Sequence, residues 1–332
     1  MPILFYVLCV LTLLFPAACG AAAGEGTAQG EEDPLVVRSE TLEIDNKKQM
    51  VIFSGNVEAG KKDFSIRCRD LHLFYLEEGT EGAGEMENAR VERVEAMGDV
   101  WITRSDGGEA RSEKAVYYQK ENTVILTGNP VVKQSEDFVE GSRITLFMGD
   151  KRSLVEGSKD KRIRAVIYPT KRTSASGAPA AGRGAAADLI KGGDEPLVVK
   201  ARRLEIDDKR RQVRIQGEVD AKKSTFGMIC REMDVYYHGD AAGAGNLRVE
   251  RVEARGEVTI TRADGGEARS DEAVYYQKED KVILTGNPVV KQGEDFVEGS
   301  RITFFIGERR SIVESSGSGR VRAVIFPGRD KK

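Results

Sequence analysis

The side chains best suited to acid–base or metal chemistry are few in this sequence, and their spacing does not form a site. The two histidines, His72 and His238, stand at non-equivalent places in a chain that repeats itself. A histidine base or ligand set would therefore not be shared by the two copies, so we interpret both as surface or strand-edge residues. The zinc motif HExxH, the phosphate-binding GxxxxGK[ST] loop and a Ser-His-Asp arrangement are also absent.

Acidic residues give two weak candidates for chemistry. Asp106-Gly-Gly108 and Asp264-Gly-Gly266 look like fragments of calcium loops, but Asp-Gly is more typical of a hairpin turn. The pairs Glu136-Asp137 and Glu294-Asp295 could act as general acids. No apolar pocket is evident in the sequence around them, so we predict solvated turns. We expect no catalytic residue, metal or cofactor, and an enzyme is the least supported function class.

The cysteines do not form a metal-binding or redox motif, since no CxxC is present. Cys9 and Cys19 fall in an apolar leader, whereas Cys68 and Cys230 occupy equivalent positions of the two copies. Cys68 alternates in phase with Phe64 and Ile66, which predicts a small buried hydrophobic residue. Equivalent points of stacked units are too far apart for a disulfide, which needs Cα atoms within about 7 Å.

The length and the ends of the chain indicate an exported protein of two domains. The chain has 332 residues and a formal charge of −3, with no basic stripe that would indicate nucleic-acid binding. Met1–Ala18 is almost wholly apolar and runs into small residues, which predicts a signal peptide over 1–23 with cleavage after Ala23. Acylation at Cys19 would instead make a lipid anchor, and an uncleaved membrane anchor is a third alternative. We expect soluble export to the periplasm.

One unit is built twice in this chain. Val124–Gln134 returns unchanged as Val282–Gln292, and residues 91–145 differ from residues 249–303 at nine of 55 positions. Looser matches extend the repeat on both sides. We therefore expect a first domain over 34–169, a flexible Ala/Gly-rich linker over 170–195 and a second domain over 196–328.

Within each copy the hydrophobic period is two throughout. Runs such as Val51–Phe53 and Val100–Ile102 alternate apolar and polar side chains, and β-branched and aromatic residues dominate them. Gly-Asn, Asp-Gly-Gly and Asn-Pro punctuate these short runs as turns. The sequence thus predicts an all-β protein of stacked rungs, each burying its apolar face against its neighbours.

The ends of such a stack are unpaired strand edges. Ile163–Ile167, near the end of the first copy, and Leu197–Lys200, at the start of the second, are rich in β-formers and lack proline. The simplest arrangement is that one copy's end abuts the beginning of the next.

Apolar residues that alternate inward would line a continuous trough. They are Leu42, Ile44, Val51, Phe53, Phe64, Ile66, Leu71, Leu73, Val100, Ile102, Ala115, Tyr117, Val124, Leu126, Ile144 and Leu146 in the first copy, and Leu204, Ile206, Val213, Ile215, Phe226, Met228, Met233, Val235, Val258, Ile260, Ala273, Tyr275, Val282, Leu284, Ile302 and Phe304 in the second. From the residues alone, this set is either a closed core or a trough that can take alkyl chains.

An ordered series of motifs extends through both copies. In the first copy it comprises Ser39-Glu-Thr-Leu-Glu-Ile-Asp45, Gly55-Asn-Val57, Ala96-Met-Gly-Asp-Val100, Ala115-Val-Tyr117, Leu126-Thr-Gly-Asn-Pro-Val-Val132 and Gly141-Ser-Arg-Ile-Thr145. The second copy repeats it from Ala201–Asp207 to Gly299–Thr303. The series resembles the OstA/LptA family of periplasmic lipopolysaccharide-transport proteins.

That resemblance implies tandem β-jellyroll or V-shaped β-solenoid domains that shield the acyl chains of lipid A. It also implies partners: lipopolysaccharide, inner- and outer-membrane transport proteins that pair with the end strands, and head-to-tail association with further copies. The tandem leaves open whether the chain is the soluble bridge itself or a relative carrying the same domain. A structural or adhesive β-repeat protein with a closed core is the alternative.

Overall fold

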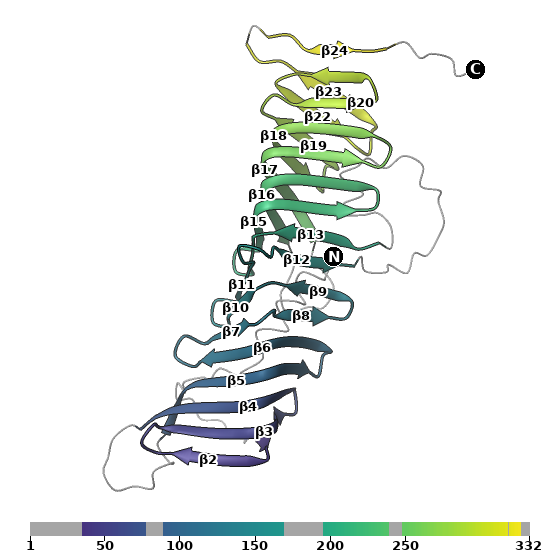
Figure 1. The fold of residues 1–332 in the computed structure, drawn as a ribbon. Helices are drawn as coiled ribbons and strands as arrows, with labels where there is room; N and C mark the ends of the chain where they lie inside the picture. Colours follow the sequence, from purple (N-terminus) through teal and green to yellow (C-terminus); the bar gives the residue numbers. More distant parts are fainter. Residues whose placement is uncertain (1–34, 78–88, 169–194, 239–247, 318, 327–332) are drawn as a thin grey trace, which may run out of the picture. The chain divides into compact units, whose positions relative to one another are not determined.

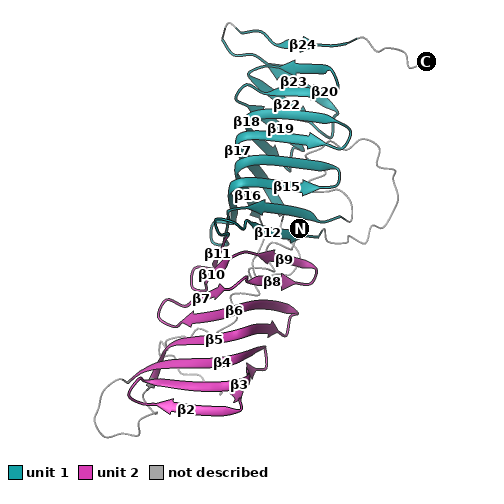
Figure 2. Cartoon of the chain, in the orientation of Figure 1, with its two compact units in different colours: residues 1–5, 157–332 teal, residues 6–156 magenta. Residues whose placement is uncertain are grey.

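The computed structural model describes residues 35–77, 89–168, 195–238, 248–317 and 319–326. The chain forms two compact units, which divide between Glu156 and Gly157 (Figure 2). The described residues are built from β-strands, and among them no helix is long and apolar enough to cross a bilayer. The expected signal peptide, Cys9, Cys19 and most of the expected linker lie outside the described residues.

The unit over 6–156 contains eleven strands among the described residues, most of them labelled in Figure 1. They are β1 (Val36–Arg38), β2 (Thr41–Asp45), β3 (Met50–Lys61), β4 (Phe64–Glu77), β5 (Ala89–Arg104), β6 (Gly108–Tyr118), β7 (Thr123–Thr127), β8 (Val131–Gln134), β9 (Asp137–Glu140), β10 (Arg143–Phe147) and β11 (Arg152–Glu156).

The other unit, over 157–332, repeats this order with one strand added at its beginning and one at its end. Its strands are β12 (Ile163–Ile167), β13 (Leu197–Ala201), β14 (Arg203–Asp207), β15 (Gln212–Lys223), β16 (Phe226–His238), β17 (Arg248–Arg262), β18 (Gly266–Tyr276), β19 (Lys281–Thr285), β20 (Val289–Gln292), β21 (Asp295–Glu298), β22 (Arg301–Phe305), β23 (Arg310–Glu314) and β24 (Arg322–Val324).

Long strands connect two half-sheets in each unit. In the unit over 6–156, the first half of β3 pairs with β2 and its second half pairs with β1. In the same way, one part of β6 pairs with β7 and the other part with β8. All these pairings are antiparallel. Because β3 to β6 pair with one another along their length, each of these long strands contributes to both half-sheets.

The bend lies at a bulge inside a long strand, whereas the Gly-Asn pattern predicts a turn between two short strands. At Gly55-Asn56 and Gly98-Asp99 both residues have positive φ, and the pairing register shifts there inside β3 and β5. A β-bulge adds a residue to one strand and bends it without ending the ladder. The expected short runs Val51–Phe53 and Val100–Ile102 are therefore parts of strands of 12 and 16 residues.

The Asp-Gly-Gly segments, in contrast, are hairpins as expected. Asp106-Gly107 joins β5 to β6, and the Asp106 carboxylate accepts a hydrogen bond from the Gly108 amide at 3.2 Å. Asp264 repeats this contact with Gly266 at 3.2 Å. Arg104 and Arg262 also pair with these two carboxylates. Both aspartates are therefore occupied in the turns themselves.

The strand that ends the first sequence copy pairs with the strand that begins the second. β12 and β13 are antiparallel over five residue pairs, from Ile163 opposite Ala201 to Ile167 opposite Leu197. Both strands belong to the unit over 157–332. This confirms the expectation that the end of one copy abuts the beginning of the next, and it assigns β12 to the same compact unit as the second copy.

Candidate functional site: an apolar trough and its margins

Directly opposed residues of an antiparallel pair carry their side chains on the same face, so the strand registers trace rows across each unit. Three such rows are mainly apolar. In the unit over 6–156, row 1 is Leu42, Phe53, Leu71, Ala96, Ala115, Leu126, Ile144 and Val155; row 2 is Ile44, Val51, Leu73, Val94, Tyr117, Val124, Leu146 and Ser153; row 3 is Val37, Ala59, Ile66, Ile102, Ala110, Val132 and Val139.

The unit over 157–332 has the same three rows. Row 1 is Leu204, Ile215, Met233, Ala254, Ala273, Leu284, Ile302 and Val313; row 2 is Ile206, Val213, Val235, Val252, Tyr275, Val282, Phe304 and Ser311; row 3 is Ala165, Val199, Ala221, Met228, Ile260, Ala268, Val290, Val297 and Ala323.

The residues expected to point inward all have the strand parity of these rows. Val100 and Val258 lie beside the bulges, where Val57 and Cys68, and Val219 and Cys230, oppose one another. Phe64 and Phe226 lie one step beyond row 3. The others are members of rows 1 to 3. Their lipid-binding role remains a prediction.

Burial varies along the rows. In the middle of each unit the side chains are fully enclosed: Leu126 and Val132 are 0% exposed and Leu284 is 1% exposed. Leu42 and Ile44, on β2, are instead 56% and 48% exposed. Their counterparts Leu204 and Ile206, on β14, are each 3% exposed. In their unit an additional strand, β12, pairs with β13, which is the counterpart of β1. The two residues on β2 therefore have the inward parity that was expected, but they are exposed.

Several residues of the rows were not predicted from the sequence to point inward. They are mainly the members of row 3 on the shorter strands, such as Val132, Val139 and Val290. A strand signal was available at Val132, because valine is β-branched and favours strands. The Asn-Pro pair that precedes it indicated a turn instead. Small residues such as Ala59 and Ala110, both buried, give little hydrophobic signal of their own.

A polar margin borders row 3 in both units. The positions two residues beyond row 3, on the same face of each strand, are mainly polar. They are Lys61, Phe64, Arg104, Gln134 and Asp137, and in the other unit Lys223, Phe226, Arg262, Gln292 and Asp295. We call each set the polar margin. Burial acts to raise the pKa of Asp106 beside this margin, but hydrogen bonds from Arg104 and from the Gly108 amide outweigh it and lower the pKa.

The acidic pairs differ from the expected solvated turns. Glu136 is exposed, but Asp137 begins β9 and is 7% exposed, with its side chain on the same face as Gln134. Its counterpart Asp295 accepts a hydrogen bond from the Phe326 amide at 2.8 Å. The error came from treating both residues of each pair alike, because the period of two places neighbouring side chains on opposite faces.

The remaining candidates for chemistry are accounted for locally. His238 is exposed and lies 3.0 Å from Glu250, and His72 is a half-buried strand residue against Phe74. Burial raises the pKa of the Cys68 thiol to about 11 and that of Cys230 to about 12, which makes both poor nucleophiles. Among the described residues, no group of three or more His, Cys, Asp or Glu could hold a metal ion.

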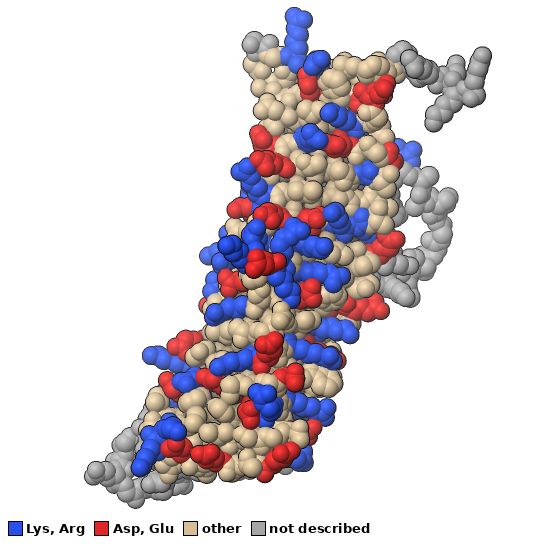
Figure 3. All heavy atoms as spheres, in the orientation of Figure 1, with Lys and Arg blue, Asp and Glu red and all other residues tan. Residues whose placement is uncertain are grey.

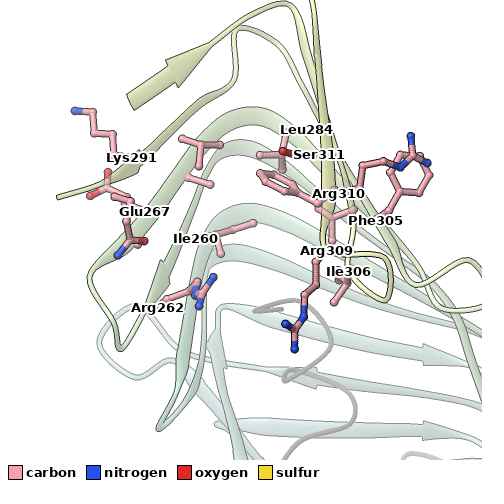
Figure 4. A pocket seen from close by; sticks show the side chains of 16 residues that line it. Ile260, Arg262, Glu267, Leu284, Lys291, Phe305, Ile306, Arg309, Arg310 and Ser311 are labelled. Atoms are coloured by element: carbon pink, nitrogen blue, oxygen red, sulfur yellow. The ribbon is translucent and has the colours of Figure 1, made fainter. Parts of the chain in front are cut away.

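The trough opens into a cavity at its last strands in the unit over 157–332. This cavity has a volume of about 510 Å³. Ile260 and Val290 of row 3, Val282 and Phe304 of row 2, and Leu284 of row 1 form its apolar wall. Figure 4 shows Arg262 and Arg309 on one side of this cavity, whereas Arg310 extends away from it beside Phe305. The cavity thus combines an apolar wall with a cationic border.

The outer surface carries charges of both signs. On the face drawn in Figure 3, Lys and Arg side chains are interspersed with Asp and Glu along both units. Many form ion pairs across strands, such as Lys114 with Glu95 at 2.7 Å and Arg67 with Glu58 at 2.8 Å. A mixed surface of this kind favours solubility, and the apolar interior is the distinctive feature of the fold.

Comparison with known proteins is consistent with this interior. The sequence matches the family described as LptA/(LptD N-terminal domain) LPS transport protein over residues 36–152 and 198–310. It is 21% identical over 141 residues to the lipopolysaccharide export system protein LptA of Escherichia coli K12, covering 42% of this chain and 73% of that protein. It is 26% identical over 108 residues to an uncharacterized protein of Rhizobium meliloti, covering 32% of this chain and 56% of that protein.

Among solved structures, one similar chain is LptH of Pseudomonas aeruginosa, described as the LptA-homologous periplasmic component of the lipopolysaccharide transport device. It has a TM-score of 0.34 and 18% sequence identity, and the match covers 42% of this chain and 97% of that chain.

Proposed function

Since the chain belongs to the LptA/(LptD N-terminal domain) family of LPS transport proteins, we propose that it binds lipopolysaccharide and shields the lipid A acyl chains in rows 1 to 3. The chain would carry this lipid across the periplasm, between inner and outer membrane, without making or breaking a bond. The observation that supports this most is the continuity of the apolar rows through each unit.

The rows fit alkyl chains because they present almost only aliphatic and aromatic carbon. Each buried CH2 group contributes about 0.8 kcal/mol, so several methylene groups are enough for useful affinity. Where tyrosines occur, their hydroxyl groups reach the edge of the rows. Tyr275, for example, donates to Asp280 at 3.1 Å. The polar atoms are thereby satisfied outside the path of an acyl chain.

A structural or adhesive protein with a closed core is the second candidate. It is favoured by the full burial of Leu126, Val132 and Ile144 in the middle of one unit. An acyl chain could pass these residues only if the two layers moved apart. In this alternative, the outer surface would carry the function and no lipid would copurify with the protein.

Photo-crosslinking in cells separates the two candidates. Leu73 and its counterpart Val235 lie in row 2 and are only half-buried, so an aryl azide or benzophenone side chain can be accommodated there. We expect lipopolysaccharide adducts at both positions. A matched probe at Arg67, on the outer face, should give none. A folded, exported protein without adducts at either inner position would favour the closed-core alternative.

The end strands are the expected contacts for protein partners. Val321, next to β24, is 42% exposed and its counterpart Ile163, on β12, is 0% exposed. Likewise Leu35 and Val36 at the start of the described chain are 50% and 46% exposed, whereas their counterparts on β13, Leu197 and Val198, are half-buried. The β12–β13 register, applied to these exposed ends, would place β24 of one copy opposite β1 of another, or opposite a similar strand of a membrane-bound transport protein.

A further inference from the structure

One inward position at the bend of each unit carries a hydroxyl group. Ser112 on β6 lies opposite Val100, and Ser270 on β18 lies opposite Val258. Ser112 stands where β6 changes its partner from β7 to β8, so it lies between row 1 and row 3. Ser270 has the same place with respect to β19 and β20. Both serines are therefore at the base of the trough, where the two half-sheets of a unit meet.

These two hydroxyl groups are buried and unpaired. Ser112 is 8% exposed and Ser270 is 7% exposed, and neither Oγ has a hydrogen-bond partner among the described residues. Thr123 is buried to the same degree, but its hydroxyl donates to the Glu121 carbonyl at 3.0 Å. A buried hydroxyl without a partner is unfavourable, so each serine gains free energy when a ligand supplies a hydrogen bond.

Small side chains surround each serine on the inward face. They are Ala96, Ala110 and Ala115 in the unit over 6–156, and Ala254, Ala268 and Ala273 in the unit over 157–332. Ala268 also lines the cavity described above, and Ser270 follows it two residues later, about 7 Å farther along the strand. The cavity therefore reaches to within one inward position of a buried, unpaired hydroxyl.

The surroundings define the kind of group that fits. The inward neighbours of Ser112 along its strand and across from it are Ala110, Ala115 and Val100, which are all apolar. A phosphate or carboxylate would lose its hydration there without gaining a countercharge. A hydroxyl group is neutral, and it pairs with a serine either as donor or as acceptor. On an amphiphile in the trough, a hydroxyl at this depth would be attached to the acyl chain.

From this geometry we propose that Ser112 and Ser270 each form a hydrogen bond with a hydroxyl group carried by an acyl chain in the trough. This assignment rests on the function proposed above and deepens it, because it names the class of acyl chain that the trough prefers. The methylene groups supply most of the affinity, and the serines distinguish a hydroxylated chain from a plain one.

The test uses the whole chain with benzoylphenylalanine at Leu73 or at Val235, both in row 2. Two probes are compared, a lipid A with a free hydroxyl on its acyl chains and a synthetic lipid A in which hydrogen replaces that hydroxyl. We expect half-maximal crosslinking at about tenfold lower concentration for the hydroxylated lipid, as for one buried hydrogen bond. S112A/S270A should remove this preference and leave crosslinking of the plain lipid unchanged.

Thermal unfolding without lipid separates binding from a structural role. S112A/S270A should leave the midpoint unchanged or raise it, because the lost hydroxyls have no partner. The control is T123V, which removes a buried hydroxyl that does have a partner, on the outward face of β7. It should lower the midpoint and keep the preference. A lowered midpoint for S112A/S270A with the preference retained would make the serines structural and overturn the site.

The lipid comparison has three other outcomes. Equal crosslinking of both lipids would overturn the hydroxyl site while leaving acyl-chain binding in place. Equal weakening of both lipids by S112A/S270A would place the serines against a group that both lipids share, such as an ester carbonyl, and would overturn selection by the chain hydroxyl. Absence of adducts with either lipid would contradict the proposed function itself.

Discussion

At the scale of single residues, the bends of β3 and β5 each depend on a glycine that no other residue replaces without strain. Gly98 has φ of +77°, and a Cβ added there would lie 2.8 Å from Cβ of Arg69. The base of a side chain cannot move aside as its tip can. A left-handed backbone and a packed neighbour therefore act together at this bulge.

We predict that Gly98→Ala destabilises the unit over 6–156 by about 2–4 kcal/mol, combining the cost of positive φ with that of overpacking. Gly107→Ala is the matched control, since Gly107 has φ of +84° but nothing within 4 Å of the added Cβ. It should cost about 1–2 kcal/mol. Urea unfolding followed by the fluorescence of Trp101 measures both; equal losses would show that the contact with Arg69 is unimportant.

At the scale of elements, the same strand is present once as an internal strand and once as an edge. Residues 164–167 and 322–325 have the same sequence, Arg-Ala-Val-Ile. β12 pairs with β13, whereas β24, among the described residues, pairs with β21 on one side. Ile325 and Phe326, which follow β24, are 75% and 52% exposed. Apolar side chains in these positions favour pairing with another chain.

A buried charge distinguishes the two settings. Ile163→Asp should strongly destabilise the unit over 157–332, by about 3 kcal/mol or more, because the carboxylate would enter a fully buried position. Its counterpart Val321→Asp should change the stability of the single chain by less than about 1 kcal/mol. It should instead weaken head-to-tail association, measured by sedimentation velocity over a range of concentrations. Unchanged sedimentation of Val321→Asp would contradict docking through β24.

At the scale of the whole molecule, the two copies of the repeated sequence carry different outer faces. In the unit over 157–332, Asp234 is 3% exposed and accepts hydrogen bonds from Arg214 at 2.9 Å and Arg255 at 2.9 Å. The first copy has Ile52, His72 and Met97 at the corresponding positions. The single tryptophan, Trp101, lies between Arg67 and Arg111 and reports only on the unit over 6–156.

Because each rung contacts mainly its neighbours, a change in one unit should stay largely local. We predict that Asp234→Leu destabilises the unit over 157–332 by about 3 kcal/mol, since two arginines lose a buried partner. The circular dichroism transition should move while the Trp101 transition does not. Combining Arg214→Ile, Asp234→His and Arg255→Met, which copies the first repeat, should restore most of the loss. A shift of both transitions for Asp234→Leu would show that the units unfold together.

The sequence by itself determined the class of fold, because period-two alternation and β-branched residues are local signals that need no tertiary contact. Within the runs that it identified as strands, it also determined which side chains share one face, since parity along a strand settles that choice. The duplication, and the abutting of Ile163–Ile167 with Leu197–Lys200, followed from repeated segments that are visible in the letters alone. The family resemblance rested on the same motifs.

Only the tertiary structure decided where strands bend and which inward residues are covered. Gly-Asn gives the same local signal for a hairpin and for a bulge, and the partner strand makes the difference. Leu42 and Leu204 have the same neighbours in sequence, Leu-Glu-Ile-Asp, yet one is 56% exposed and the other 3%. Burial depends on what packs beyond the strand, so a repeated sequence can be core in one copy and an open end in the other.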